Sequence, residues 1–220
     1  MQTIKGRVRE VRRIASPVPE PQALAIADGF FWMSSRGVPT LYRVDPQNWT
    51  VEHTESAPGA IWGLAPGPQG LAAVCGVGAD DDRYLYHYDF EGGFRADHHA
   101  LPDLTGAYVA YDDASQLYLL TQWYKKRVIE LDDCAKAIRS IETPHELCGI
   151  CWVDGGFYLL GTDDEDTDEY FVSRLDFGDD APQIEDVARL GFPGRSVAFE
   201  GRHLWSNHRA ADEIVGFELP

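Results

Sequence analysis

The chain has 220 residues, of which 44% are hydrophobic and 12% aromatic, enough to build a packed core. Its formal net charge is −17 at pH 7. This acid excess argues against nucleic acid or an anionic membrane surface as a partner, because both require clustered Lys and Arg.

The chain begins with MQTIKGRVREVRRI, which lacks the apolar segment of a secretory signal. No stretch is long and apolar enough to predict a membrane-spanning helix. The four cysteines are then expected to be reduced thiols. We therefore expect a cytoplasmic protein.

The first predicted element is a strand over residues 5–17, KGRVREVRRIASP. It carries a basic run made of Lys5, Arg7, Arg9, Arg12 and Arg13. Positive charge on an edge strand discourages edge-to-edge pairing with other chains, and we favour this interpretation over partner binding.

From residue 24 onward, one pattern of strands occurs five times. Each copy opens with a hairpin whose bend is marked by turn residues such as Asp-Gly or Gly-Gly. The five hairpins lie at 24–34, 63–74, 109–120, 150–160 and 197–206. An alternating hydrophobic hexamer with an acid near its end follows each hairpin: LYRVDP at 41–46, LYHYDF at 85–90, VIELDD at 128–133, VSRLDF at 172–177 and IVGFEL at 214–219.

The spacing and the alternation of these hexamers predict the fold. Their acids are 42 to 44 residues apart, and a period of about 40–50 residues is typical of four-stranded propeller blades. Helical repeats would place apolar residues about 3.6 positions apart, whereas here Leu41 and Arg43 share one face of a strand and Tyr42 and Val44 the other. We therefore expect an all-β chain with four antiparallel strands per repeat.

The last repeat is one strand short, because the chain ends after IVGFELP. The strand over residues 5–17 aligns with the missing one, and pairing it into the last repeat would leave no open sheet edge in the ring. We expect a single domain over 1–220, a closed five-bladed β-propeller with adjacent termini. Its blades are expected at about 23–59, 60–104, 105–146, 147–194, and 195–220 together with 5–17.

The hairpin at DG followed by LYRVDP resembles the propeller superfamily that includes NHL-type repeats, the gluconolactonase group and streptogramin lyases. Residues 21–35, PQALAIADGFFWMSS, also resemble the opening blade of the glutaminyl cyclotransferase family, with Gln22 at the position of that family's glutamine. Where that family carries a glutamate at its second inner strand, this chain reads GAIWGL, with Ile61 and Trp62. The resemblance therefore implies the fold and not the cyclotransferase activity.

Two sets of loops are expected to meet at one end of the propeller axis. Strands alternate in direction, so the loop between the second and third strands emerges on the same face as the link between blades. Candidate ligand-binding residues in these loops are Gln22, Arg36, Trp62, Tyr108, Gln122, Trp123, Tyr124, Asn207 and Arg209. The aromatic residues among them depart from the repeat, which favours a ligand wall over a structural core.

Three residues in the same loops are the catalytic candidates. His145 and His208 could move a proton, because an imidazole titrates near neutral pH, although either could be an ordinary loop histidine. Arg195, in FPGRSVAF, could hold a carboxylate or phosphate of a ligand. Its alternative role is a structural salt bridge with an acidic loop residue such as Glu146.

The run TDDEDTDEY at 162–170 is the densest acidic segment. Its acids alternate as in calcium loops, but the glycine and the distal glutamate of that motif are missing. We favour a solvated acidic loop and predict no cofactor. The alternative, by resemblance to the gluconolactonase group, is a divalent metal, calcium or zinc, held on the axis by Asp163, Asn207 and Glu146.

The motif CGIC at 148–151 resembles redox and zinc motifs. Residues three apart on a strand point to opposite faces, so Cys148 and Cys151 are not expected to share a disulfide or a metal unless a bulge intervenes. A nucleophilic Cys148 near His145 is the alternative to a buried thiol that only packs.

From these loops we expect a protein that binds a small polar or aromatic metabolite in an axial funnel, with lyase, isomerase or hydrolase chemistry as the candidate activity. Catalysis predicts His145, His208 and Arg195 around one cavity. The alternative is a non-catalytic protein-interaction scaffold, which predicts a funnel plugged by side chains. The sequence does not indicate the oligomeric state.

Overall fold

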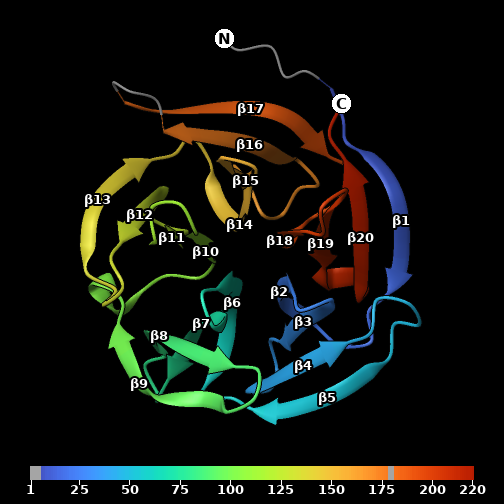
Figure 1. Ribbon diagram of the computed structural model, residues 1–220. Coiled ribbons are helices and arrows are strands. Elements are labelled where there is room, and N and C mark those ends of the chain that lie inside the picture. Colours follow the sequence, from blue (N-terminus) through green and yellow to red (C-terminus); the bar gives the residue numbers. More distant parts are fainter. Residues whose placement is uncertain (1–5, 178–180) are drawn as a thin grey trace.

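The computed structural model describes residues 6–177 and 181–220. Within those residues, twenty strands form five sheets of four antiparallel strands. The sheets surround a central axis as the blades of a five-bladed β-propeller (Figure 1). The predicted fold class is confirmed.

The blades follow one another along the chain. Blade 1 contains β2 (Pro21–Ala27), β3 (Phe30–Ser35), β4 (Thr40–Val44) and β5 (Val51–Ser56). Blade 2 contains β6 (Ala60–Gly67), β7 (Gly70–Val77), β8 (Asp82–Asp89) and β9 (Gly93–Ala100). Blade 3 contains β10 (Val109–Asp112), β11 (Leu117–Gln122), β12 (Arg127–Leu131) and β13 (Ala137–Glu142).

The last two blades complete the ring. Blade 4 contains β14 (Glu146–Val153), β15 (Gly156–Thr162), β16 (Tyr170–Phe177) and β17 (Pro182–Leu190). Blade 5 contains β18 (Arg195–Phe199), β19 (Leu204–His208), β20 (Glu213–Glu218) and β1 (Arg9–Ala15). The helices of the described residues are two short 3-10 turns, Pro102–Leu104 and Arg209–Ala211, and none of them has the length and hydrophobicity needed to span a membrane.

The ring is closed by the N-terminal strand, as the sequence predicted. β1 pairs antiparallel with β20 from Arg9 opposite Glu218 to Ala15 opposite Glu213. The first and last described residues lie side by side, since a Cβ built on Gly6 would lie 3.4 Å from Cβ of Pro220. The observed strand is shorter than the predicted 5–17, and Lys5 lies outside the described residues.

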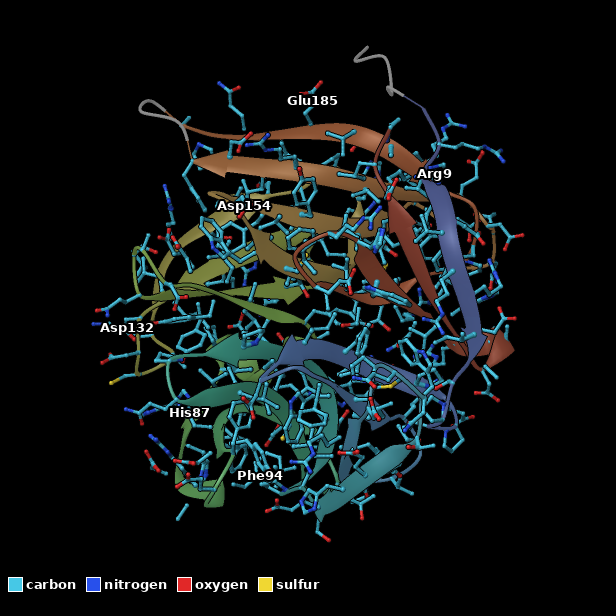
Figure 2. The ribbon with its side chains drawn as sticks, turned by 45° about the vertical axis from the view of Figure 1, so that its right-hand side comes forward. Arg9, His87, Phe94, Asp132, Asp154 and Glu185 are labelled. Atoms are coloured by element: carbon cyan, nitrogen blue, oxygen red, sulfur yellow. The ribbon has the colours of Figure 1, made fainter. Side chains whose placement is uncertain are left out.

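The hexamers form the third strand of each blade, and their alternation reflects packing on both faces. In β4, Leu41 packs with Ile61 and Leu64 of blade 2. Val44, on the other face, packs with Trp205 of blade 5. The core therefore lies between blades, while charged side chains such as those of Arg9 and Asp132 lie at the periphery (Figure 2).

Aromatic residues at equivalent positions of four hairpins pack between the blades. Trp32, Tyr118 and Trp205 are buried, and the half-buried Tyr158 packs against the core shared by blades 3 to 5. The ring of Trp205 lies 5.2 Å from the ring of Phe31 across the interface between blades 5 and 1.

Four of the five innermost strands begin with a register shift. The shifts lie between Pro21 and Leu24, Ile61 and Gly63, Leu147 and Gly149, and Arg195 and Ala198. A bulge adds a residue on one strand and redirects its side chain. These bulges carry Gln22 and Trp62, which line the axial cavity described below.

Candidate functional site

A cavity of about 450 Å³ opens at one end of the propeller axis. Links between blades and loops between second and third strands both contribute to its lining, as the alternation of strand direction predicted. The lining includes Arg195 and eight of the nine predicted ligand-binding residues: Gln22, Arg36, Trp62, Tyr108, Gln122, Trp123, Tyr124 and Arg209.

Positive charge is concentrated in this cavity, although the chain as a whole carries −17. The lining contains Arg36, Arg83, Lys125, Arg195 and Arg209 against Asp80, Asp81 and Glu165. Arg83 is neutralised locally, because its Nη2 lies 2.5 Å from Oδ2 of Asp81. No carboxylate of residues 6–177 or 181–220 lies within ion-pair distance of Arg36 or Arg209. The cavity therefore presents uncompensated positive charge.

Arg195, at the start of β18, is the most buried of these cations, with 8% of its surface exposed. Its Nη1 donates to the hydroxyl of Tyr170 at 2.7 Å and to the carbonyl of Gly194 at 3.2 Å. Its guanidinium lies 5.3 Å from the ring centre of Trp123. These contacts hold the group in place, yet its carboxylate partner, Glu165, is 3.4 Å away. A buried cation with so loose a partner is costly unless an anion joins it.

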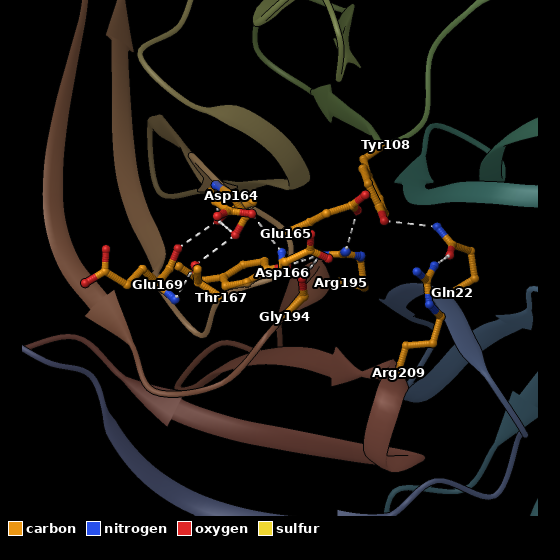
Figure 3. Close-up of polar contacts among 12 residues, drawn as sticks. Gln22, Tyr108, Asp164, Glu165, Asp166, Thr167, Glu169, Gly194, Arg195 and Arg209 are labelled. Atoms are coloured by element: carbon orange, nitrogen blue, oxygen red, sulfur yellow. Dashed lines mark hydrogen bonds and ion pairs between the residues drawn. The ribbon is translucent and has the colours of Figure 1, made fainter.

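A hydrogen-bonded chain crosses the cavity from blade 5 to blade 3. Arg209 Nη1 donates to Oε1 of Gln22 at 2.6 Å, and Gln22 Nε2 lies 3.0 Å from the hydroxyl of Tyr108 (Figure 3). Burial raises the pKa of Tyr108 to about 12, so this hydroxyl stays protonated at neutral pH. Burial lowers the pKa of Arg209, and the positive charges of Arg195 and Arg36 act in the same direction. An anion among these groups would relieve that repulsion.

One wall of the cavity contains an indole packed against an arginine. The guanidinium of Arg83 lies 4.0 Å from the ring centre of Trp62, and Nε1 of Trp62 donates to Oδ1 of Asp81 at 3.2 Å. Arg83 Nη1 also donates to the carbonyl of Gly106 at 3.1 Å. The indole is thus held on one face by Arg83 and at its Nε1 edge by Asp81, which fixes its orientation in the cavity lining.

The rim of the cavity comes from the loop between β11 and β12. Gln122 is committed to this rim, because its Nε2 donates to Oγ1 of Thr105 at 2.7 Å and its Oε1 accepts from Nε of Arg127 at 2.6 Å. Lys125 pairs with Asp103 at 2.6 Å. Tyr124 is 93% exposed and lies at the mouth rather than within the cavity.

The two candidate histidines lie outside the cavity lining. His145 is buried in blade 4, where Nδ1 lies 2.9 Å from Asp163, Nε2 lies 3.1 Å from Asp186, and the ring stacks on Phe171. His208 lies 3.4 Å from Glu213 and packs near Phe192. The expected cluster of both imidazoles with Arg195 around one cavity is not found, because each ring is directed to partners in its own blade or its neighbour.

The contacts of His145 predict a pH-dependent stability. Burial opposes the charged imidazole, but the hydrogen bonds and charges of Asp186 and Asp163 outweigh it and raise the pKa of His145 above its ordinary 6.5. The charged imidazole therefore contributes fully to the free energy of unfolding below pH 6.5. This contribution is lost as the pH rises through the raised pKa of His145 in the folded protein. The hydrogen bond from His145 lowers the pKa of Asp186 below its ordinary 3.8. The stability contributed by the Asp186 carboxylate is therefore lost as the pH falls through this lowered pKa.

Urea unfolding of wild type and His145→Asn at pH 5.5 and pH 9 tests this prediction. The free energy lost by the substitution is expected to be larger at pH 5.5, where the imidazolium is paired. The exposed His53, 3.6 Å from Glu55, provides the control His53→Asn, for which little pH dependence is expected. Equal losses at both pH values for His145→Asn would contradict the assignment.

The residues of the alternative metal site are not drawn together at the cavity. Asp163 contacts His145, and Glu146 pairs with Thr162 at the start of β14. Asn207 is fully buried in β19, and its Oδ1 and Nδ2 have no hydrogen-bond partner in the described chain. In the ranges that the structure describes, no group of three or more His, Cys, Asp or Glu side chains is placed to hold a metal ion.

All four cysteines are free thiols. A bulge does occur at Cys148, between Leu147 and Gly149, yet Cys148 and Cys151 do not pair. Burial raises the pKa of Cys148 to about 12, against the opposing charge of Arg195. The thiol is therefore protonated at neutral pH, and the geometry favours packing over a nucleophilic role.

Some lining residues were missed by sequence reasoning. Arg83, in β8, and Leu104, in the link between blades 2 and 3, were not among the candidates. Glu165 was grouped with the solvated acidic run and not connected to Arg195. The sequence could have indicated Arg83, because it directly follows the acidic loop residues 80–82 on the predicted ligand face. Its stacking on Trp62 could not be predicted, because that contact joins two different strands.

No protein-family model and no curated protein sequence matches the chain. Similar solved structures include a glutaminyl cyclase from Myxococcus xanthus, with 13% identity, a TM-score of 0.73, and 99% of this chain and 98% of that chain covered. A PQQ-bound aldose sugar dehydrogenase from Streptomyces coelicolor has 14% identity and a TM-score of 0.57, with both chains fully covered. A streptogramin B lyase has 10% identity, a TM-score of 0.52 and 97% of both chains covered.

These comparisons confirm the resemblance to β-propellers stated from the sequence. At 10–14% identity they show the shared fold alone. The similar structures include enzymes of different reaction types, so the fold leaves the chemistry of this chain to be argued from its own site.

Proposed function

We propose that this protein binds a small organic anion with a polar or aromatic body in the axial cavity, and that Arg195 anchors the anionic group. The observation that carries the proposal is the buried Arg195 guanidinium, with only the exposed Glu165 as ion-pair partner, in a cavity that Arg36 and Arg209 also line. Guanidinium groups recognise carboxylates and phosphates through paired hydrogen bonds. The cavity volume of about 450 Å³ is in the range of small-molecule sites.

The remaining lining suits the body of such a ligand. Trp62 offers a fixed aromatic face, and the protonated hydroxyl of Tyr108 can donate a hydrogen bond. A scaffold function predicts that side chains plug the axial opening, whereas the cavity is open at this end. We therefore favour ligand binding over the scaffold function.

Lyase, isomerase or hydrolase chemistry would require a proton acceptor in the cavity. The two imidazoles expected for this role lie outside the lining, and the carboxylates within it are those of Asp80, Asp81 and Glu165. Asp81 is already paired with Arg83. Binding is therefore the proposed function, and a chemical step on the ligand would use a carboxylate rather than an imidazole.

Binding of benzoate, phenyl phosphate and the neutral analogue benzamide, measured by thermal shift and calorimetry, tests this proposal. Arg195→Met is expected to weaken binding of the two anions by about 10- to 100-fold, because a charge-assisted hydrogen bond contributes about 1.5–3 kcal/mol. Binding of benzamide is expected to be weak in both proteins and similar between them.

Two further variants keep this test interpretable. Arg209→Met removes a less buried cation of the cavity and is expected to weaken anion binding without the packing defect that Arg195→Met could cause. Arg174→Met removes an arginine of β16 that pairs with Asp176 outside the cavity, and no effect is expected. If an anion shifts wild type and Arg195→Met equally, Arg195 is not the anchor.

A further inference from the structure

The loop between β15 and β16 places one acidic side chain in the axial cavity. Residues 163–169 fold back on the buried Thr162, whose Oγ1 lies 2.9 Å from the carbonyl of Asp164 and 2.8 Å from that of Glu169. Thr167 Oγ1 donates to the same Asp164 carbonyl at 2.9 Å. The loop is thus closed by its own hydrogen bonds, with Glu165 at the end that reaches the cavity (Figure 3).

Glu165 contacts the group that anchors the proposed ligand. Its Oε2 lies 3.4 Å from Nη2 of Arg195, and its negative charge also acts on Arg209. The two partners differ in exposure, since 61% of the Glu165 side chain is accessible to solvent against 10% for Arg195. One member of this ion pair is therefore fixed, and the other can move away into water.

We propose that Glu165 is an internal competitor that pairs with Arg195 in the empty cavity and is displaced by the anionic group of the ligand. This inference rests on the proposed function. Nη1 of Arg195 is committed to Tyr170 and Gly194, so Nη2 is the nitrogen that both Glu165 and a ligand anion can use. A carboxylate or phosphate that approaches Nη2 favours the displacement of Glu165, because two anions beside one nitrogen repel each other.

This competition sets the class of ligand that the cavity accepts. A neutral molecule gains nothing by displacing Glu165, since it would leave Arg195 without its partner. A ligand with a carboxylate or phosphate restores the pair in a more enclosed position, where the interaction is stronger than at the exposed loop. Arg195 thereby selects anions, and Glu165 lowers the affinity for all of them.

Calorimetric binding of benzoate to wild type and Glu165→Gln tests the inference. The amide keeps the size of the side chain and removes its charge, so benzoate is expected to bind about 2- to 5-fold more tightly, the upper range for a largely exposed ion pair. Asp166→Asn is the matched control, because Asp166 lies next to Glu165 in the same exposed loop but makes no ion pair with Arg195. It changes the net charge equally and is expected to change affinity less than twofold.

The outcomes separate this inference from the proposed function. If benzoate binding depends on Arg195 but Glu165→Gln leaves it unchanged or weakens it, Glu165 is not a competitor and the proposed function stands. If Asp166→Asn strengthens binding as much as Glu165→Gln, the effect is one of net charge and the inference is wrong. If benzoate binds without dependence on Arg195, or does not bind, both proposals are wrong.

Discussion

Deletion of residues 1–15 is expected to prevent the chain from folding as a cooperative unit. β1 is the outer strand of blade 5, and its six residue pairs with β20 join the start of the chain to its end. Each lost backbone hydrogen bond costs about 0.5–1.5 kcal/mol, and a domain of this kind has about 5–15 kcal/mol in total. The deletion also exposes the edge of β20, which can then pair with other chains.

Circular dichroism, urea unfolding and gel filtration test this expectation. The truncated chain is expected to aggregate or to unfold at a much lower urea concentration than wild type. A circular permutant provides the matched control: a short linker joins Pro220 to Gly6, and new ends are placed at the turn between β14 and β15, near Gly155. The permutant keeps every strand pair and is expected to fold. A truncated chain with wild-type stability would show that closure by β1 is dispensable.

Gly63→Ala is expected to lower the free energy of unfolding by about 3 kcal/mol or more, the upper range for an overpacked core. A Cβ at Gly63 would lie 2.2 Å from the carbonyl oxygen of Ala107 and 2.7 Å from Cα of Tyr108. Both are backbone atoms, so no side-chain rotation relieves the clash. The innermost strands of blades 2 and 3 must separate instead, and Tyr108 moves with them.

The same substitution therefore connects stability to the site. Gly63→Ala is expected to weaken benzoate binding as well, because Tyr108 hydrogen-bonds Gln22 in the cavity lining. Gly67→Ala, in the same strand β6, is the control: its nearest neighbour would be 3.6 Å from the new Cβ, an ordinary contact. Urea unfolding is expected to show little change for Gly67→Ala. Similar losses for the two alanine variants would refute the close-approach argument.

The fold could be predicted because it is written as a local pattern repeated five times. Each hexamer alternates since both faces of its strand pack on neighbouring blades, as Leu41 and Val44 do. The last blade lacked one strand, and the basic segment at the start of the chain had no other place in the repeat. Pairing the two was predicted because an open ring would leave two unpaired sheet edges. Strand direction alone then assigned loops to one face, which is why Gln22, Tyr108 and Arg209 were found as candidates.

Which of those loop residues share the cavity was decided by tertiary contacts that a sequence pattern does not encode. His145 belongs to the correct set of loops, but its ring turns to Asp163 and Asp186 of blade 4. Glu165 comes from a run of exposed acids, yet a turn closed on Thr162 carries it to Arg195. The sequence by itself determined the five-bladed ring and the face of the ring that carries the candidate loops, because strand period and strand direction are local properties. The direction of each side chain depends on contacts with other strands and blades, and only the tertiary structure decides those contacts.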